Sequence, residues 1–302
     1  MSAGHDTDLL IVGAGPAGVA AAVMADSLGM HTVLIEAGWV GGKLHHIPAL
    51  QNVPGSWQTG PALAQALAAD IARVTETGRC RLVQDRAVRV AGHEDRADVV
   101  LANGQVLSAA AAVVATGVTS LGPGHVDWIT APDRFRAAPL WRAAPTDLND
   151  VTHVLGADRP LGTWLRAHPD VRRTLNVLCP PEDDYKAAEV ADDDRVQFLP
   201  IARVTIAEAG QGQGWNLHTE NCSGESVTYI AGTVLSNLGN RPAALDGLVQ
   251  GEDGYCPAEL QHPRILTAGD LGSARFQRIV TAQGAGAKAA LARYYDTALA
   301  GA

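Results

Sequence analysis

The residues with the clearest chemical signature lie near the start of the chain, where positions 13–18 read Gly-Ala-Gly-Pro-Ala-Gly. They follow a short apolar run and precede an alanine-rich stretch, so they join an expected strand to an expected helix. In that place Gly13 permits the tight turn, Gly15 lets a pyrophosphate approach the backbone, and Gly18 lets the helix pack closely. The free amides and partial positive charge of the helix N-terminus favour a bound anion.

An acidic partner for this turn is Glu36, which follows the second expected strand. Its distance along the chain is close to the roughly 20 residues that separate the glycines from the acidic residue in dinucleotide-binding folds. A carboxylate at this position can accept both ribose hydroxyls of an adenosine. The turn and Glu36 together predict a site for an adenine dinucleotide.

A second glycine turn, at residues 156–162, reads Gly-Ala-Asp-Arg-Pro-Leu-Gly and departs from the fingerprint twice. Asp158 takes the place of the second glycine, and Leu161 takes the place of the third. A carboxylate repels a pyrophosphate, so we expect weak nucleotide binding here. This part of the chain would then keep its shape and serve as a lid or a docking surface.

Hydrophobic patterning predicts the elements that carry these residues. The first part has expected strands at 9–12 and 32–35, helices at 16–28 and 61–74, a loop at 41–55, an antiparallel sheet within 81–106 with a hairpin turn at Asn103-Gly104, and a buried strand at 109–115. The second has an irregular connector at 119–148, a βαβ-like passage at 151–178, and short strands at 196–199, 203–207, 215–219, 227–230 and 233–238. A strand at 264–270 and a helix at 278–299 follow. The expected fold class is α/β with two Rossmann-like units.

Composition narrows the functional classes further. The chain has 302 residues, of which 47% are hydrophobic, and this length suits two domains or one elaborated domain. The net charge of −9 argues against nucleic acid and anionic membranes as partners. No secretory signal or membrane-spanning run is recognisable. Four widely separated cysteines fit neither a disulfide framework nor a metal site, so we expect a reducing, cytoplasmic location and no bound metal.

Several further motifs, taken with the first glycine turn, resemble the thioredoxin reductase-like flavoproteins in order and spacing. The motifs are residues 13–18 with Glu36, 41–44 (Gly-Gly-Lys-Leu), 52–55 (Asn-Val-Pro-Gly), 115–117 (Ala-Thr-Gly), 267–270 (Thr-Ala-Gly-Asp) and 277–284 (Gln-Arg-Ile-Val-Thr-Ala-Gln-Gly). The resemblance implies three-layer ββα domains, with an FAD-binding domain (1–118 and 243–302) split by an inserted NADPH-type domain (119–242). It also implies a homodimer.

Carried over residue by residue, the resemblance implies the positions that hold FAD. They are Gly13, Gly15, Pro16, Ala17, Gly18, Glu36, Gly42, Lys43, Leu44, His45, Asn52, Ala115, Thr116, Gly117, Gly269, Asp270, Arg278 and Ile279. Among them, Asp270 would hold the ribityl or pyrophosphate portion, or act only as a cap at the end of its strand. The helix entered at Arg278 would point its amides at the flavin pyrimidine edge, where reduction adds negative charge.

The departures from this family concern the inserted domain. Disulfide-reducing members carry a CxxC pair some twenty residues after the Ala-Thr-Gly strand end, and here residues 134–141 contain no cysteine. Without two neighbouring thiols there is no dithiol relay, so thioredoxin reduction by the usual route is disfavoured. NADPH-users of the family present basic residues after the next strand, whereas residues 179–184 read Cys-Pro-Pro-Glu-Asp-Asp, and only Arg159, Arg172 and Arg173 lie nearby in sequence.

The predicted function is an FAD-dependent oxidoreductase that exchanges electrons directly through its flavin. Its donor would be something other than NADPH, such as a protein carrier or a small organic molecule. One alternative is an NAD(P)H-dependent reductase of ferredoxin or flavodoxin type, and another is a non-catalytic FAD-binding or redox-sensing protein. His45 and His46 are the candidate proton carriers near the flavin, although a purely structural role fits them equally.

Overall fold

The computed structural model describes residues 7–183, 188–210 and 214–300. The chain divides into two compact units, which we call unit 1 (Met1–Thr119 with Arg241–Ala302) and unit 2 (Ser120–Asn240). Two short strands, β8 (Val118–Ser120) and β18 (Asn240–Pro242), pair with each other at the sequence boundaries of the two units. None of the described helices has the length and hydropathy needed to cross a membrane.

Unit 1 is built on a five-stranded parallel sheet in the order β19-β7-β1-β2-β3. Its strands are β1 (Leu9–Val12), β2 (Thr32–Glu36), β3 (Cys80–Gln84), β7 (Ala111–Val114) and β19 (Ile265–Thr267). The prediction that β3 belongs to the antiparallel sheet is wrong. Among the described strands, it pairs only with β2 at the edge of the sheet, so most of its residues are exposed or partly exposed, unlike the continuously buried strand that a parallel sheet predicts.

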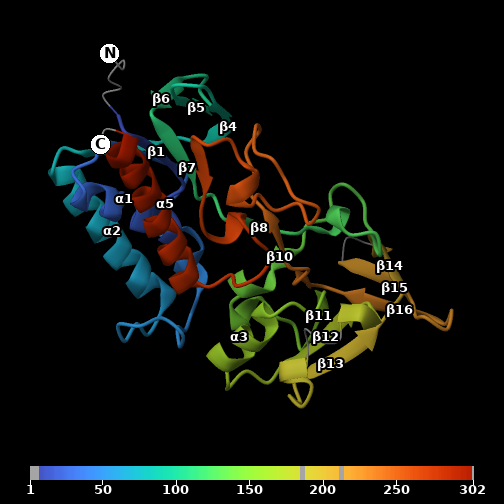
Figure 1. The fold of residues 1–302 in the computed structure, drawn as a ribbon. Helices are drawn as coiled ribbons and strands as arrows, with labels where there is room; N and C mark the ends of the chain where they lie inside the picture. The colour runs from blue at the N-terminus through green and yellow to red at the C-terminus, as the bar shows by residue number, and fades with distance from the viewer. Residues whose placement is uncertain (1–6, 184–187, 211–213, 301–302) are drawn as a thin grey trace. The chain divides into compact units, whose positions relative to one another are not determined.

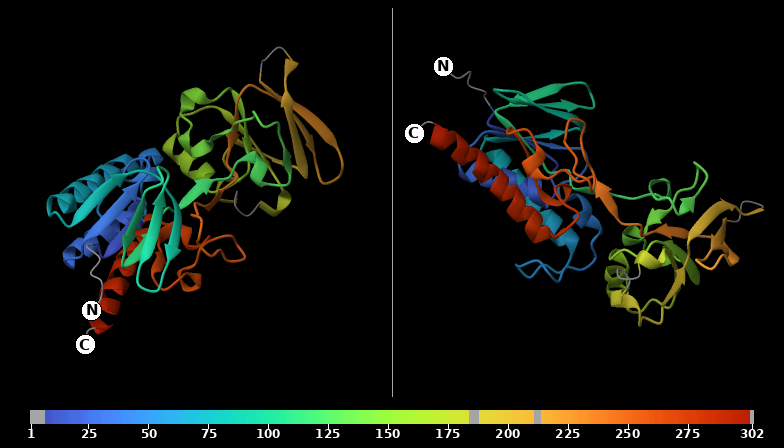
Figure 2. Two further views of the ribbon diagram at one scale, coloured as in Figure 1. Left: turned by 90° about the horizontal axis from the view of Figure 1, so that it is seen from above. Right: turned by 45° about the vertical axis from the view of Figure 1, so that its right-hand side comes forward.

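Two different layers cover the faces of this sheet (Figures 1 and 2). One layer contains the helices α1 (Pro16–Ser27), α2 (Gly60–Glu76) and α5 (Ile279–Ala300), and the other is a three-stranded antiparallel sheet of β4 (Ala87–Gly92), β5 (Ala97–Leu101) and β6 (Val106–Ala109). Successive side chains of β1 lie on opposite faces of the sheet. Leu9 and Ile11 pack in the core beneath the helices (the helix-side core), and Leu10 and Val12 pack in the core beneath the antiparallel sheet (the sheet-side core). Unit 1 therefore has the three-layer ββα architecture expected from the sequence.

Unit 2 repeats this scheme on a smaller scale. Its parallel sheet has the order β10-β17-β11-β12-β13. Its second sheet has the order β16-β15-β14-β9 and is antiparallel except for the parallel pair of β14 and β9. The elements are β9 (Ile129–Thr130), β10 (Ala138–Pro139), β11 (Val151–Leu155), α3 (Pro160–Ala167), β12 (Thr174–Cys179), β13 (Val196–Pro200), β14 (Arg203–Glu208), β15 (Trp215–Glu220), β16 (Ser226–Ala231) and β17 (Val234–Ser236).

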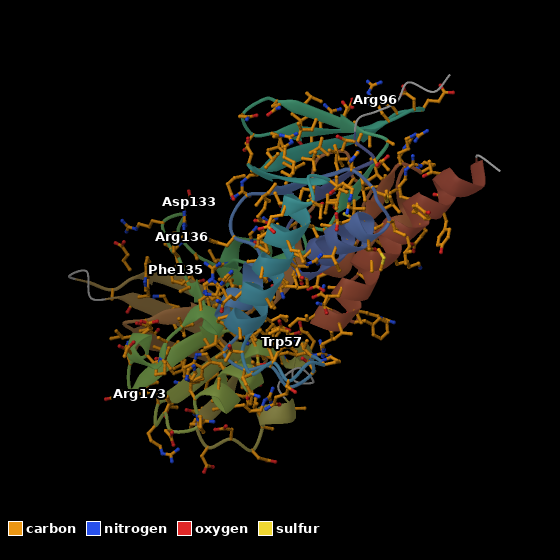
Figure 3. The ribbon with its side chains drawn as sticks, turned by 90° about the vertical axis from the view of Figure 1, so that its left-hand side faces the viewer. Trp57, Arg96, Asp133, Phe135, Arg136 and Arg173 are labelled. Carbon is orange, nitrogen blue, oxygen red and sulfur yellow. The ribbon has the colours of Figure 1, made fainter. Side chains whose placement is uncertain are left out.

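The connector at 119–148 is more ordered than its prolines suggested, because β9 and β10 each extend one sheet of unit 2 by two residues. Its Phe135, labelled in Figure 3, lies in the core. The ring of Phe135 meets that of Trp215 edge to face, with 4.8 Å between the ring centroids. Single 3₁₀ turns occupy η2 (Pro123–His125), η3 (Leu140–Arg142), η4 (Pro145–Asp147), η5 (Pro181–Asp183), η6 (Ala188–Val190) and η8 (Ala258–Leu260). Within 119–148, the short strands β9 and β10 and the turns η2, η3 and η4 therefore replace the irregular connector that was predicted.

A buried polar pair interrupts the core between the two sheets of unit 2. His153 on β11 and Asn176 on β12 are direct register partners, and both are almost fully buried. Neither ring nitrogen of His153 has a hydrogen-bond partner among the described residues, and the same holds for Asn176 Oδ1. Burial lowers the pKa of His153, so the neutral imidazole is the form that the folded chain accommodates.

This pair makes the stability of the chain sensitive to acid. Because the unfolded state binds a proton at His153 first, stability should fall as the pH drops from about 6.5 towards the lowered folded pKa, by up to about 1.4 kcal/mol per pH unit. In urea unfolding between pH 7.5 and 5, the free energy of unfolding of His153→Leu should fall less with decreasing pH than that of the wild type. Burial and the charge of Arg195 also lower the pKa of His168. The variant His168→Gln therefore measures how much of the pH dependence of stability comes from this second histidine. Parallel curves for the wild type and His153→Leu would contradict the assignment.

Candidate dinucleotide site

The first glycine turn lies at the carboxyl ends of three adjacent strands. The Gly13 N–H donates to the carbonyl of Ile35 (2.8 Å), and the Ala115 N–H donates to that of Val12 (2.8 Å). Gly13 has φ +98°, and a methyl group added to it would lie 2.6 Å from the Ala115 carbonyl oxygen. A methyl group on Gly18 would lie 1.7 Å from the carbonyl oxygen of Gly13. The chain's own packing therefore requires glycine at both positions.

Gly15 is different, because nothing in the chain requires a glycine there. Its φ of −74° and ψ of −175° suit any residue, and a methyl group added to it would meet no atom within 4 Å. The open space lies at the start of α1, where the free amides and the helix dipole favour an anion. No contact within the described part of the chain explains the glycine at this position. The open space beside Gly15 instead suits the close approach of a bound pyrophosphate.

The structure brings Glu36 to this turn. One carboxylate oxygen accepts from the Ala14 N–H at 2.6 Å, and the other accepts from the Gly38 N–H at 2.7 Å. Gln84 Nε2 on the neighbouring strand β3 donates to the carbonyls of Glu36 and Gly38, which fixes the loop that follows β2. Gln84 is not among the predicted site residues, although it ends β3 directly beside Glu36 in the register.

Two cationic residues of unit 1, Lys43 and Arg278, act electrostatically on Asp270. Burial, the largest influence, raises the pKa of Asp270, and the positive charges of Lys43 and Arg278 act in the opposite direction. Asp270 lies in the 3₁₀ turn η9 (Gly269–Leu271) and not at a strand end as predicted, because β19 already stops at Thr267. A methyl group on Gly269 would lie 2.9 Å from Ala17 Cβ, so this turn packs against the first turn of α1.

The end of β7 is tied to the returning segment of unit 1. Thr116 Oγ1 donates to the Ala243 carbonyl (2.7 Å), and the Ala243 N–H donates to the Gly117 carbonyl (2.9 Å). The Thr116 hydroxyl is therefore engaged within the chain. The backbone of Ala115 lies directly against Gly13 in the glycine turn.

The predicted loop at 41–55 begins with a 3₁₀ helix, η1 (Gly42–His46), which the sequence analysis missed. Positive φ angles at Gly41 and Gly42 start the turn, and Leu44 anchors it in the helix-side core. His45 Nε2 lies 2.8 Å from the Val40 carbonyl oxygen, to which it must donate. The His45 ring is therefore held within its own loop.

The remaining predicted residues of this region lie on its solvent side. Asn52 and His46 are exposed, and the loop returns to the helix-side core through Trp57 (Figure 3). Helix α5 starts at Ile279, one residue later than predicted, and the Arg278 N–H donates to Thr281 Oγ1. Among the described residues, no group of three histidine, cysteine or acidic side chains is arranged to hold a metal.

The second glycine turn, in unit 2, repeats the backbone of the first turn. The Gly156 N–H donates to the Leu178 carbonyl (2.8 Å), and Gly156 has φ +88°. A methyl group on Gly156 would lie 2.6 Å from the Asn237 carbonyl oxygen, the same distance as that from Gly13 to Ala115. By this correspondence, Asp158 occupies the position of Gly15.

The course of the chain after Asp158 also differs from that in unit 1. The Asp158 carbonyl accepts from Asn237 Nδ2 (2.7 Å) and from the Leu161 N–H, and the Leu161 side chain is buried in the core of unit 2. Helix α3 begins at Pro160 and has 8 residues, whereas α1 has 12. At the position where a pyrophosphate would approach the second turn, the chain thus has the Asp158 carboxylate, and the helix that follows, α3, is shorter than α1.

No two of the four cysteines share a hydrophobic core. Cys80 lies in the helix-side core and Cys256 in the sheet-side core of unit 1, while Cys179 lies in a core of unit 2. Burial raises the pKa of the Cys80 and Cys256 thiols, which lowers their thiolate fraction. Cys222 is exposed on the turn between β15 and β16.

Comparison with known proteins supports this architecture. Residues 7–131 match the family model of pyridine nucleotide-disulphide oxidoreductases. The chain is 26% identical over 298 residues to the thioredoxin reductase of Listeria monocytogenes, covering 92% of this chain and 90% of that protein. It is 23% identical over 316 residues to the bifunctional thioredoxin reductase/thioredoxin of Mycobacterium leprae, covering 95% of this chain but only 65% of that protein.

Two solved structures share the fold over nearly the whole chain. The thioredoxin reductase of Lactococcus lactis has a TM-score of 0.75 at 19% identity, covering 96% of this chain and 98% of that one. The thioredoxin reductase of T. acidophilum has a TM-score of 0.73 at 19% identity, with the same coverage. The comparisons confirm the expected fold with two Rossmann-like domains, and they confirm FAD as the cofactor of a thioredoxin reductase-like oxidoreductase.

Proposed function

We propose that the chain is an FAD-dependent oxidoreductase in which electrons pass directly between the flavin and an external partner. No dithiol of the chain takes part, and NADPH is not the donor. The observation that carries this proposal is the contrast between two equivalent backbone positions. Gly15 leaves open space at the first glycine turn, whereas Asp158 places a carboxylate at the second.

The FAD side of the proposal rests on unit 1. The amides at the start of α1 and the Glu36 carboxylate would bind the adenosine diphosphate part, and Lys43, Asp270 and the start of α5 would bind the flavin part. Bound FAD supplies the redox chemistry. If FAD binds here, the start of α5 would stabilise negative charge on the flavin, and the cationic side chains of Lys43 and Arg278 would act in the same sense.

The case against NADPH rests on unit 2. Asp158 opposes a pyrophosphate, and Glu182 and Asp183 add negative charge after β12, where a 2′-phosphate needs cations. Asp184 of the same acidic run lies outside the described residues. Arg173 pairs with Asp150 just before β11 begins, at the opposite end of that strand from Gly156. The basic residue within the turn itself is Arg159, and it is exposed.

The relatives' names favour a second candidate function, the NADPH-dependent reduction of thioredoxin. That reaction needs two thiols close enough to form a disulfide and to exchange it with the substrate. Here the three buried cysteines belong to three separate cores, and Cys222 is exposed on a hairpin. This arrangement supports direct electron exchange over a dithiol relay.

His45 and His46 remain the proposed proton carriers. The hydrogen bond from His45 Nε2 to the Val40 carbonyl leaves Nδ1 as the ring atom that can exchange a proton. A homodimer in the cytoplasm and a protein carrier or small molecule as the electron partner complete the proposal.

An anaerobic redox titration of the purified, FAD-loaded protein tests the proposal. We expect a yellow protein whose absorbance is unchanged by excess NADPH or NADH and is lost on photoreduction. Full reduction should consume about two electrons per FAD, rather than the roughly four that a flavin with a dithiol takes up. An artificial one-electron acceptor should then restore the colour.

Each contrary outcome has a distinct meaning. Rapid reduction by NADPH would favour the ferredoxin-type reductase, and uptake of four electrons would favour thioredoxin reduction. A photoreduced protein that passes electrons to no acceptor would favour a sensor. A colourless protein that cannot take up FAD would contradict every flavin-based function.

A further inference from the structure

Trp39 exposes 80% of its surface, although it is the largest apolar side chain on the loop between β2 and η1. It lies three residues after Glu36. Tryptophan is enriched at binding surfaces, because its ring offers a large apolar contact area. The position of Trp39 beside the proposed adenosine site makes its exposure informative.

The backbone that carries Trp39 is fixed on both sides. Gln84 Nε2 donates to the carbonyls of Glu36 (3.0 Å) and Gly38 (2.8 Å) before it. After it, the Gly41 N–H donates to the carbonyl of Ala14 in the glycine turn (2.8 Å). The exposure of Trp39 is therefore a property of an anchored loop, which is held at once to β3 and to the glycine turn.

We propose that Trp39 is the stacking surface for the adenine ring of the bound dinucleotide, an inference that rests on the FAD site proposed above. Glu36 is the group expected to bind the ribose hydroxyls, and adenine is joined directly to that ribose. The base must therefore lie within reach of the loop that follows Glu36. A planar indole stacks on a purine face, and such stacking contributes strongly to affinity without base-specific hydrogen bonds.

The rate of FAD release from the full-length, FAD-loaded protein tests this role. After dilution, released FAD is followed by its fluorescence. Trp39→Ala and Trp39→Leu should each release FAD about 10-fold faster, whereas Trp39→Phe, which keeps a planar ring, should stay close to the wild type. Tyr295→Ala, which removes a half-exposed aromatic ring from α5, is the matched control and should leave the rate unchanged. Thermal melting checks that each variant is folded.

The possible failures are distinguishable. Equal release rates for the wild type and Trp39→Ala would overturn the stacking role and leave the proposed function intact. Release that is accelerated equally by Phe and Ala at this position would also overturn it, because a planar ring would not suffice. A change in elution volume without a change in release would assign Trp39 to a contact between subunits. A wild-type protein that takes up no FAD would instead contradict the proposed function.

Discussion

Gly15→Asp should abolish FAD binding while leaving the protein folded. A carboxylate about 4 Å from a phosphate charge costs about 4 kcal/mol at an effective dielectric constant near 20, which corresponds to a roughly 1,000-fold loss of affinity. The fold should tolerate the change because Gly15 has an ordinary backbone conformation and no atom within 4 Å of an added methyl group. Gly15 is also the N-cap of α1, a position where aspartate stabilises a helix.

The expected result is thus a colourless protein that melts at the same temperature as the FAD-free wild type, or slightly above it. Bound flavin after purification and the FAD dissociation constant provide the measurements. Gly124→Asp is a matched control, because Gly124 also has open space around it but lies in unit 2. Retention of FAD by Gly15→Asp would show that the pyrophosphate does not approach this turn.

Asp158→Asn should increase the affinity for NADPH by about 10-fold or more and accelerate flavin reduction by NADPH. The substitution removes the charge that opposes the pyrophosphate, while the carbonyl that Asn237 binds is unchanged. The gain should stay well below the cost predicted for Gly15→Asp, because Leu161 and the short helix α3 still differ from a working fingerprint. Calorimetric titration with NADPH and anaerobic stopped-flow reduction measure the two effects.

Asp170→Asn provides the control for net charge. Asp170 is exposed on the segment that follows α3, so this variant has the same overall charge as Asp158→Asn without altering the turn. If both variants bind NADPH equally, the Asp158 carboxylate is not the barrier. If NADPH rapidly reduces the flavin of both Asp158→Asn and the wild type, the proposal that unit 2 binds no coenzyme is wrong.

The glycine turn was the part of the site most accessible from the sequence, because its function depends on residues that are close along the chain. The strand, turn and helix around Gly13 are set by apolar runs, by glycine's tolerance of positive φ, and by a proline suited to the first helical turn. The same local logic identified the departure at Asp158.

The convergence of Lys43, Asp270 and Arg278 could not be derived from local patterning. These residues come from three segments that are brought together only when β19 and α5 complete the fold of unit 1. The clamp formed by Gln84 was missed for a related reason, since it depends on β3 joining the parallel sheet beside β2. An edge strand with one exposed face does not reveal from its sequence which sheet it will join.

The distribution of the cysteines has a practical consequence. Because Cys80, Cys179 and Cys256 are enclosed in packed interiors and Cys222 stands on an exposed hairpin, a maleimide dye or spin label added to the native protein should attach at one position. The wild-type chain thus provides a ready-made reporter site on unit 2, without any engineered mutation.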